Sequence, residues 1–238
     1  MNFVIPMAGR GQRFVDAGFK TPKMLIEAKG KSLLEWSIDS LPLELCTNLI
    51  FVLLKEHAEN HKLDSFVTLK YKKYNPKFVY LDEVTRGQAE TVLKAKHLLD
   101  MSVDLVIYNI DTAFNSVTLH NTLINNKKDG VIGAFVDLSD SSKYSYAKLD
   151  GESNVTEVVE KVKISDFALT GFYHFTNPED FISLAEMNIQ NNNTVKGEYY
   201  VAPIYNQLLE KGKNFVIDIC QSIDVLGTPE ELISFKNA

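Results

Sequence analysis

The chain begins with Phe3-Val4-Ile5-Pro6-Met7-Ala8-Gly9-Arg10-Gly11-Gln12-Arg13-Phe14, an apolar run that opens into a loop with two glycines, and Thr21-Pro22-Lys23 follows shortly after. Glycine lets backbone N–H groups approach an anion without a Cβ in the way. Arg13 can place its guanidinium across phosphate oxygens, and Lys23 can add a mobile point charge. These features predict a nucleoside triphosphate site after the first strand; a surface turn with two solvated cations is the alternative.

Two better-known phosphate-binding loops are excluded. A dinucleotide fingerprint needs a third glycine at the position where this chain has Phe14. Gly30-Lys31-Ser32 resembles the end of a Walker loop, but Leu25 replaces the earlier glycine of that motif. Ser32 is better explained as the N-cap of a helix, because Glu35 three residues later would complete a capping box.

Hydrophobic periodicity predicts alternating strands and helices in the first half of the chain. Continuous apolar runs at Asn48–Leu54 and Asp104–Ile110 indicate strands that are covered on both faces. Between them, Gln88–Leu99 repeats apolar residues at helical spacing. Ser32–Ser40 and Ser116–Asn125 indicate two further helices. This alternation is typical of a parallel sheet with right-handed crossovers.

The pattern changes near Gly130, where strand-like segments begin to follow one another directly. Asp150-Gly151 is a hairpin signal between two of them. The second half is expected to hold strands over Val131–Leu138, Tyr144–Leu149, Val155–Glu160, Ala168–Phe175 and Phe215–Ile219, helices over Glu179–Gln190 and Tyr200–Lys211, and a last helix with Thr228 as N-cap and Pro229 at its first position. We therefore expect a doubly wound α/β fold with a mostly parallel, mixed sheet.

Composition narrows the class of protein. A chain of 238 residues with 45% hydrophobic residues can bury one full core, which is normal for a single α/β domain. The net charge of −6 argues against a nucleic-acid-binding protein. Cys46 and Cys220 are isolated in apolar runs and are expected to be reduced core residues. Neither a signal peptide nor a membrane span is apparent, so we expect a cytoplasmic enzyme.

Further motifs follow the first loop in a fixed order. They are Thr85–Thr91, Asn109-Ile110-Asp111, Val159-Glu160-Lys161, Ala168–Tyr173 and Gly227–Leu232. Together with Gly9-x-Gly11-x-Arg13 and Pro22-Lys23, this set resembles the sugar-nucleotidyltransferase superfamily and spans nearly the whole chain. The family's usual G-G-x-G-T/S-R loop is reduced here to Ala-Gly-Arg-Gly-Gln-Arg. The resemblance implies a single Rossmann-type, GT-A-like domain over 1–238, with a nucleotide-binding half (about 1–129) and an acceptor-binding half (about 130–238).

The resemblance also implies roles for individual residues. Lys23 and Arg13 would be catalytic, and Asp111 would hold Mg²⁺. Asp224 is the candidate second metal ligand, although its spacing from Gly227 differs by one residue from the family's pattern. The nucleotide would contact Ala8, Gly9, Arg10, Gly11, Arg86, Gly87 and Gln88, and the acceptor would contact Tyr146, Lys148, Glu160, Lys161 and Gly171.

Each of these assignments has a structural alternative. Lys23 can be a solvated loop lysine, and Arg13 can hold its loop by binding carbonyl groups. Asp111 can cap the turn that follows it, which is common for aspartate. Glu160 can be a surface charge at a strand end. Asp224 is as readily a surface residue as a metal ligand.

The chemistry implied by the family is attack of an acceptor phosphate oxygen on the α-phosphorus of the nucleotide, with pyrophosphate leaving. No protein nucleophile is needed, because the attacking group is already an anion. The protein must hold two polyanions together and neutralise the charge that builds on the α-phosphate and the leaving oxygen. Mg²⁺ binds one or two carboxylates together with phosphate oxygens and water, so one strand-end aspartate is adequate.

The acceptor is predicted from a narrower likeness. Ser145–Lys148, Glu160-Lys161 and Gly197–Pro203 resemble a bacterial subgroup found with capsule and surface-polysaccharide synthesis. Its members include cytidylyltransferases that act on phosphoglutamine for the capsular phosphoramidate. Tyr146 stands where sugar-activating members usually have a small residue, which favours a smaller or linear acceptor. Lys148 and Glu160 would then pair with the carboxylate and the ammonium of an amino acid.

Alternatives from other classes stay open at this point. One is a sugar-1-phosphate nucleotidyltransferase that makes a nucleoside-diphosphate sugar. A metal-dependent glycosyltransferase would normally carry Asp-x-Asp, where this chain has Asn109-Ile110-Asp111. A non-catalytic relative would be expected to lack the lysine or the carboxylate, and both are present. The choice between CTP and UTP and the oligomeric state are left open.

Overall fold

β1 (Asn2–Met7) lies at the centre of the fold in a computed structural model that describes residues 1–238. It pairs in parallel with β4 (Asn48–Leu54) on one side and with β6 (Leu105–Tyr108) on the other. β4 pairs in parallel with β5 (Lys77–Leu81). Because these four strands run in the same direction, their carboxyl ends meet at one edge of the sheet, where ligands bind in open α/β folds.

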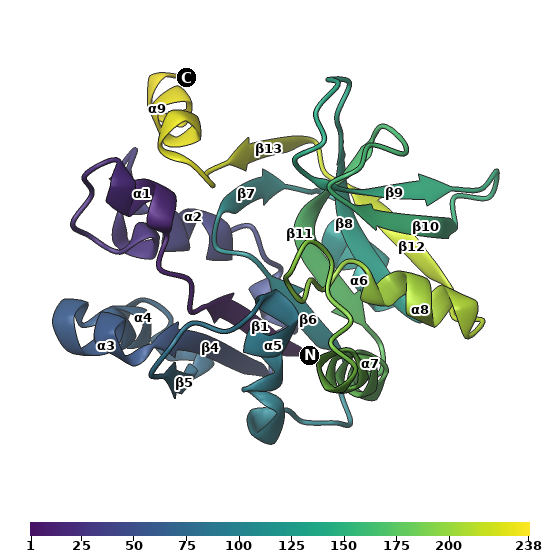
Figure 1. Ribbon diagram of the computed structural model, residues 1–238, viewed down its shortest axis with the longest axis horizontal. Helices are drawn as coiled ribbons and strands as arrows, with labels where there is room; N and C mark the ends of the chain where they lie inside the picture. Colours follow the sequence, from purple (N-terminus) through teal and green to yellow (C-terminus); the bar gives the residue numbers. More distant parts are fainter.

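The sheet continues from β6 into strands of the second half (Figure 1). β11 (Phe167–Phe175) pairs antiparallel with β6, with β8 (Gly130–Val136) and with β9 (Ser145–Leu149). β9 forms a hairpin with β10 (Val155–Glu160), and β12 (Phe215–Ile219) lies parallel to β8. The result is one mixed sheet of nine strands, parallel through the first half, which confirms the predicted fold class.

Two small sheets flank the main one, and neither was predicted. β2 (Glu27–Ala28) and β3 (Lys31–Ser32) form a short hairpin. β7 (Thr112–Asn115) pairs antiparallel with β13 (Ser222–Val225). The N–H of Leu226 donates to the Asp111 carbonyl at 2.7 Å. The end of the chain therefore lies directly beside the segment that follows β6.

The helices cover both faces of the sheet and one of its edges (Figure 1). They are α1 (Gln12–Asp16), α2 (Leu33–Ile38), α3 (Lys55–His61), α4 (Leu63–Lys70), α5 (Gln88–Leu93), α6 (Leu119–Asn125), α7 (Pro178–Gln190), α8 (Ile204–Glu210) and α9 (Pro229–Asn237). Short 3₁₀ turns occur at Lys23–Leu25, Leu43–Leu45, Lys72–Tyr74 and Lys96–Leu98. None of the helices has both the length and the apolar character needed to cross a membrane, and a cytoplasmic location stays a prediction.

The core has an apolar layer on each face of the sheet, and a third, smaller apolar cluster holds residues of α1, α2 and α9 together. Val4 packs in a layer with residues of α5, α7 and α8, whereas Phe3 and Ile5 pack in a layer with residues of α2, α4 and α6. This division follows from the alternation of side chains along a strand. Complete burial of one such side chain contributes about 1.5–3 kcal/mol to stability. β1 is thus held by packing from both sides.

Helix ends follow the predicted capping residues in two places and differ from prediction elsewhere; the helix expected over Tyr200–Lys211, for example, covers only Ile204–Glu210. Ser32 forms the capping box with Glu35, and Thr228 caps α9 by accepting from the Glu231 N–H at 3.2 Å. The helix expected over Gln88–Leu99 ends at Leu93 and continues as a 3₁₀ turn. The helix expected from Ser116 begins at Leu119, because the preceding residues belong to β7 and the turn after it.

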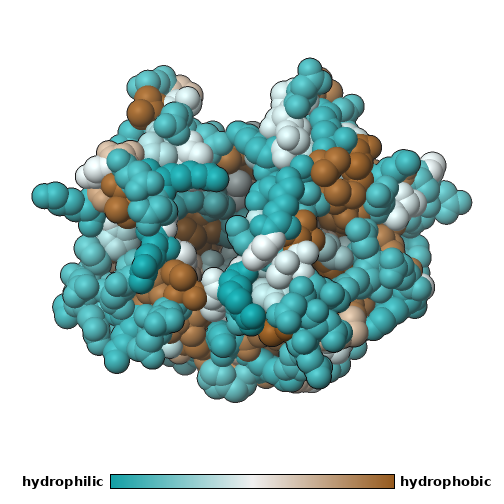
Figure 2. Space-filling view, viewed as in Figure 1, coloured by the Kyte–Doolittle hydropathy of each residue, from teal (hydrophilic) through white to brown (hydrophobic).

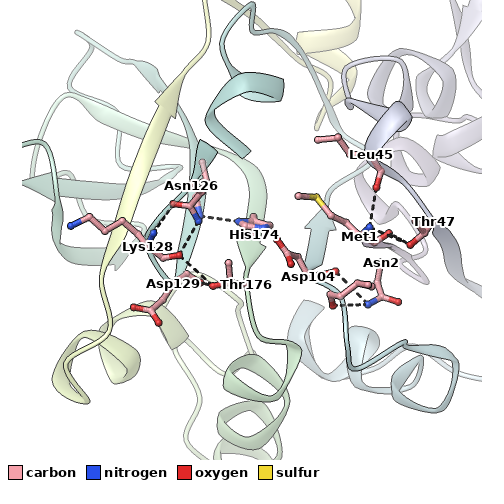
Figure 3. Close-up of polar contacts among 12 residues, drawn as sticks. Met1, Asn2, Leu45, Thr47, Asp104, Asn126, Lys128, Asp129, His174 and Thr176 are labelled. Carbon is pink, nitrogen blue, oxygen red and sulfur yellow. Dashed lines mark hydrogen bonds and ion pairs between the residues drawn. The ribbon is translucent and has the colours of Figure 1, made fainter. Parts of the chain in front are cut away.

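Polar contacts fix the opposite, amino-terminal edge of the central strands (Figure 3). The Asn2 amide donates to the Asp100 carbonyl at 2.8 Å, and the Asn2 N–H donates to the Asp104 carbonyl at 2.7 Å. His174, which is fully buried in β11, lies 2.8 Å from the Asp104 carboxylate. These contacts join β1, β6 and β11 far from the carboxyl edge, so that edge is free to carry ligands.

Candidate active site

A cleft of about 1030 Å³ opens at the carboxyl ends of the parallel strands, between the two halves of the chain, and the hollow is visible in the middle of Figure 2. Pockets for one small ligand have volumes of about 300–1000 Å³, so this cleft is at the upper end of that range. Its charged lining residues are five cations and four carboxylates, although the whole chain carries a net charge of −6. They are Arg13, Lys23, Arg86, Lys143, Lys161, Asp111, Glu160, Glu198 and Glu231.

Lys23 and Asp111 meet in this cleft. Lys23 begins the 3₁₀ turn after Pro22, and Asp111 follows the end of β6. The Lys23 ammonium lies 3.1 Å from the Asp111 carboxylate. The lysine side chain is only 11% exposed, whereas the carboxylate is 40% exposed and open to the cleft. A cation and a carboxylate predicted to act on the same phosphates are therefore adjacent, although they are far apart in the sequence.

The loop after β1 forms the neighbouring wall. Ala8, Gly9, Gly11 and Arg13 line the cleft. Arg13 is exposed and has no ion-pair partner, which leaves its guanidinium available to a ligand. Arg10 does not line the cleft; its side chain points to α3 and lies 3.6 Å from Glu56. This placement contradicts the prediction that Arg10 contacts the nucleotide.

The turn Arg86-Gly87-Gln88 lines the cleft at the start of α5. The Arg86 guanidinium forms an ion pair with Glu90 at 3.0 Å and lies 5.0 Å from the centre of the Tyr199 ring. The Gln88 amide donates to the Asn109 side chain. Both long side chains of the turn are thus held in fixed positions beside the cleft.

Position 87 must be glycine because the backbone of Tyr199 lies very close to it. Its φ of 147° lies outside the range that other residues favour. A Cβ at this position would lie 2.5 Å from the backbone of Tyr199. Tyr199 also donates to the Arg86 carbonyl at 3.0 Å and accepts from the Ala89 N–H at 2.9 Å. The turn of the first half is therefore bound to a segment of the second half.

Gly171 plays a comparable part on β11. Its φ is 86°, and a Cβ there would lie 2.4 Å from the Asn109 side-chain nitrogen. The absence of a side chain leaves room for Asn109, which in turn receives the Gln88 amide. Gly171 lines the cleft, and its contact with the acceptor stays a prediction.

The second half of the chain contributes a buried carboxylate and a lysine, at and just after the end of β10. Glu160 is 8% exposed and accepts a hydrogen bond from the Ser145 hydroxyl on β9. Burial raises the pKa of Glu160 above its usual value. The Lys161 ammonium donates to the Tyr200 hydroxyl and lies 4.5 Å from the centre of that ring. Both predicted residues line the cleft.

The charge of Lys161 is maintained by its neighbours. Partial burial acts to lower the pKa of Lys161, but the Tyr200 contact and the nearby Glu160 and Glu198 carboxylates outweigh it and raise the pKa overall. Lys161 is thus cationic at neutral pH. A lysine that is charged and held by a phenol can bind an anionic group of a ligand.

Tyr146 and Lys148 do not face the cleft, so their predicted contact with the acceptor is wrong. Tyr146 is fully buried among apolar residues of the core, and its hydroxyl donates to Asp137 at 2.7 Å. Lys148 is exposed and outside the cleft lining. The residue of β9 that faces the cleft is Ser145. Both faces of β9 are buried at Ser145 and Tyr146, and therefore the sequence pattern does not reveal which face borders the cleft.

Asp224 also lies away from Asp111. Along β13 the side chain that lines the cleft is Val225, whereas Asp224 is exposed and borders a separate, smaller pocket with Glu230. Asp224 therefore does not share a site with Asp111, contrary to the prediction. No group of three or more His, Cys, Asp or Glu side chains is placed to hold a metal. The role of Asp111 as a Mg²⁺ ligand stays a prediction.

Several lining residues were not predicted from the sequence. Lys143 and Tyr144 come from the loop after β8, Tyr173 from β11, Tyr200 from the segment after Gly197, and Glu231 from α9. The only sequence signal for Lys143 and Tyr144 was their place at or directly before the start of the strand predicted over Tyr144–Leu149. Glu231 lies inside the Gly227–Leu232 motif, but no role was predicted for it.

Comparisons with known proteins agree with this geometry. The sequence matches the nucleotidyl transferase family over residues 3–236. It is 26% identical over 224 residues to the UTP–glucose-1-phosphate uridylyltransferase of Haloferax volcanii, covering 90% of this chain and 85% of that protein. Among solved structures, the nucleoside-diphosphate-sugar pyrophosphorylase from Vibrio cholerae RC9 has 30% identity and a TM-score of 0.85, covering 99% of this chain and 100% of that one.

A more distant structure shares the fold. The inositol-1-phosphate CTP transferase from T. maritima superposes with a TM-score of 0.79 over 99% of this chain and 96% of that chain. Its sequence is only 14% identical. This likeness extends to the architecture alone.

We expect Gly87→Ala to disrupt the site. The added Cβ would clash with the Tyr199 backbone, and the strained φ adds a cost of about 1–3 kcal/mol. The melting temperature should fall, and triphosphate binding measured by calorimetry should weaken. Gly151→Ala is the matched control, because a Cβ at Gly151 meets nothing within 4 Å. Equal behaviour of the two variants would contradict the role given to the Gly87 turn.

Proposed function

Because this chain belongs to the nucleotidyl transferase family, it is an enzyme that acts on a nucleoside triphosphate and a phosphorylated substrate, and we propose that it transfers CMP from CTP to a small phosphorylated acceptor, phosphoglutamine in particular. Pyrophosphate would be released. The observation that carries this proposal is the Lys23–Asp111 ion pair, 3.1 Å apart, at the carboxyl edge of the sheet.

The two sides of the cleft are suited to binding the two different substrates. Gly9, Gly11 and Arg13 border the side formed by the first half, where a triphosphate would lie. Glu160 and Lys161 border the side formed by the second half, where the acceptor would lie. The reacting phosphates would then meet near Lys23 and Asp111. Holding two reactants in this way contributes to catalysis by removing the entropy of their encounter.

Each cation would have a distinct task. Lys23 is largely buried, so its charge acts in an environment of low dielectric, where it can stabilise the negative charge that develops on the α-phosphate. Arg13 is exposed and unpaired and would bind the leaving pyrophosphate. Asp111 would hold Mg²⁺, which neutralises phosphate charge when bound. Asp111 is the one carboxylate beside Lys23 with this exposure, and it suits an ion that takes most of its ligands from phosphates and water.

The base would lie against the turn at Arg86, Gly87 and Gln88. The Arg86 and Gln88 side chains are fixed by Glu90 and Asn109, so they would restrict the space beside the turn. A pyrimidine is smaller than a purine and would fit there more readily. The preference for CTP over UTP rests on the resemblance of the sequence to cytidylyltransferases.

The proposal that phosphoglutamine is the acceptor rests on the charged residues that line the cleft. Tyr146 is buried in the core and cannot narrow the acceptor pocket. The acceptor side instead presents Glu160, Lys161 and Tyr200, which can bind an ammonium group and an anionic group of one small molecule. Phosphoglutamine carries both. We therefore propose a cytoplasmic role in modifying capsule or surface polysaccharide.

A sugar-1-phosphate nucleotidyltransferase is the second candidate. It is favoured by the relatives, because the Haloferax volcanii protein is a UTP–glucose-1-phosphate uridylyltransferase and the Vibrio cholerae protein is a nucleoside-diphosphate-sugar pyrophosphorylase. The same Lys23–Asp111 pair would serve that reaction. A glycosyltransferase is disfavoured by the match to the nucleotidyl transferase family along nearly the whole chain.

We predict different effects for Lys23→Ala and Arg13→Ala. Loss of Lys23 should lower kcat by about 100-fold, since it removes one transition-state contact. Loss of Arg13 should also raise the KM for the triphosphate. Steady-state kinetics of pyrophosphate release would measure both, with Lys20→Ala, an exposed lysine of the same loop, as the control. Wild-type kinetics for Lys23→Ala would refute the assignment.

Asp111→Asn should remove metal recruitment while keeping the fold, because asparagine has the same shape without the charge. Activity should fall sharply and should not recover at ordinary Mg²⁺ concentrations, and EDTA should abolish wild-type activity. Circular dichroism would check the fold, and Mn²⁺ titration followed by electron paramagnetic resonance would check binding. Normal Mn²⁺ affinity in this variant would mean that another carboxylate holds the ion.

Turnover should be highest with CTP and phosphoglutamine and weak with hexose 1-phosphates. A panel of the four triphosphates with each acceptor, followed by pyrophosphate release and mass spectrometry of the product, tests this directly. Efficient reaction of UTP or TTP with a hexose 1-phosphate would reject phosphoglutamine and select the second candidate. No pyrophosphate release with any pair would reject nucleotidyl transfer itself.

A further inference from the structure

The loop between β8 and β9, residues 137–144, is held firmly at its base. The Asp137 carboxylate accepts from the Ser139 N–H at 3.0 Å and from the Tyr146 hydroxyl at 2.7 Å. The same hydroxyl lies 2.6 Å from the Ser141 carbonyl, and the Lys163 ammonium donates to the Asp137 carbonyl at 2.6 Å. Tyr146 thus serves as an anchor for this loop.

The anchored loop brings Lys143 into the cleft. The Lys143 ammonium lies 2.7 Å from the Glu231 carboxylate of α9 and 4.9 Å from the centre of the Tyr144 ring. Partial burial acts to lower the pKa of Lys143, but the contacts with Glu231 and Tyr144 raise it overall. Lys143 is therefore a charged group that reaches from the acceptor half to the last helix.

Glu231 is fixed in place by contacts other than Lys143. Its second carboxylate oxygen accepts from the Gly227 N–H at 2.9 Å, and its own N–H donates to the Thr228 hydroxyl at 3.2 Å. The Glu231 side chain is 20% exposed, whereas Lys143 is 53% exposed. The lysine is consequently the partner that can move away from this ion pair.

The pair lies next to the proposed reaction centre. A Cβ built on Gly227 would lie 3.2 Å from a Glu231 oxygen and 3.7 Å from the Asp111 oxygen that contacts Lys23. The ion pairs Lys23–Asp111 and Lys143–Glu231 thus both lie close to Gly227. The α-phosphate and the attacking phosphate of the acceptor would meet beside these groups.

We propose that Lys143 is an additional binding residue for the phosphate of the acceptor, and that Glu231 holds it in position until the acceptor arrives. The backbone joins Lys143 to the proposed acceptor side of the cleft, because the Lys161 N–H donates to the carbonyl of the neighbouring Tyr144 at 2.9 Å. A phosphate dianion binds more than one cation well, and its hydrogen bonds to ammonium groups are charge-assisted. This inference rests on the proposed transfer to a phosphorylated acceptor.

The test is a calorimetric titration of inorganic phosphate into protein saturated with the non-hydrolysable analogue α,β-methylene-CTP. Lys143→Ala should weaken phosphate binding by about 10-fold, the effect of one charge-assisted hydrogen bond. Lys143→Arg should retain most of the affinity. Glu231→Gln keeps an acceptor for the Gly227 N–H but frees Lys143, so it should bind phosphate at least as tightly as the wild type.

Lys96→Ala is the matched control, because Lys96 and Glu186 also form an ion pair at 2.7 Å but lie outside the cleft. Its phosphate affinity should equal that of the wild type. Unchanged affinity in Lys143→Ala would overturn the proposal. So would equal losses of affinity and melting temperature in Lys143→Ala and Glu231→Gln, which would indicate a purely structural pair.

The same titrations separate this inference from the proposed function. If the wild type fails to bind the CTP analogue and each of the other triphosphates, nucleotidyl transfer is rejected. Phosphate is then titrated into the protein without nucleotide, and the difference between the wild type and Lys143→Ala still decides whether Lys143 binds phosphate.

Discussion

The parallel pairing of β1 with β4 and β6 is the constraint on which the rest of the molecule depends. Each of these strands is buried on both faces, and the buried polar side chains of β1 and β4, Asn2 and Asn48, lie at the amino-terminal edge of the sheet. The polar groups of these strands that a ligand can reach therefore lie beyond their carboxyl ends. The loops after β1, β5 and β6 all open at the same edge, and the cleft is where they meet.

The second half of the chain reaches the site through backbone hydrogen bonds as well as through side-chain packing. Tyr199 exchanges two hydrogen bonds with the turn around Gly87, and Leu226 binds the carbonyl of Asp111. Backbone contacts of this kind tolerate little change in geometry. They position the turn at Gly87 and the Asp111 carboxylate relative to the second half of the chain, while the apolar clusters behind them provide the stability.

The sequence was sufficient where local signals were strong. The continuous apolar run Asn48–Leu54 coincides with β4 at both ends, and the capping box of Ser32 is present as predicted. The sequence did not predict which residues border the cleft where both faces of a strand are buried. Tyr146 and Ser145 are both buried, so alternation along β9 carried no signal about the cleft. The pairing of β13 with β7, which turns Asp224 outward, is a long-range contact that no local pattern encodes.

The contact between Leu226 and the end of β6 has a consequence for biosynthesis. Asp111 is followed by more than a hundred residues before the segment that borders it is made. Closing such a loop is entropically costly and favours slow, late pairing. A ribosome-bound chain would hold its β1 loop and Lys23 early, yet it would lack the wall formed by β13 and α9 until those later segments had been made. The nascent chain would therefore have an incomplete cleft, and no activity, until α9 emerged from the ribosome.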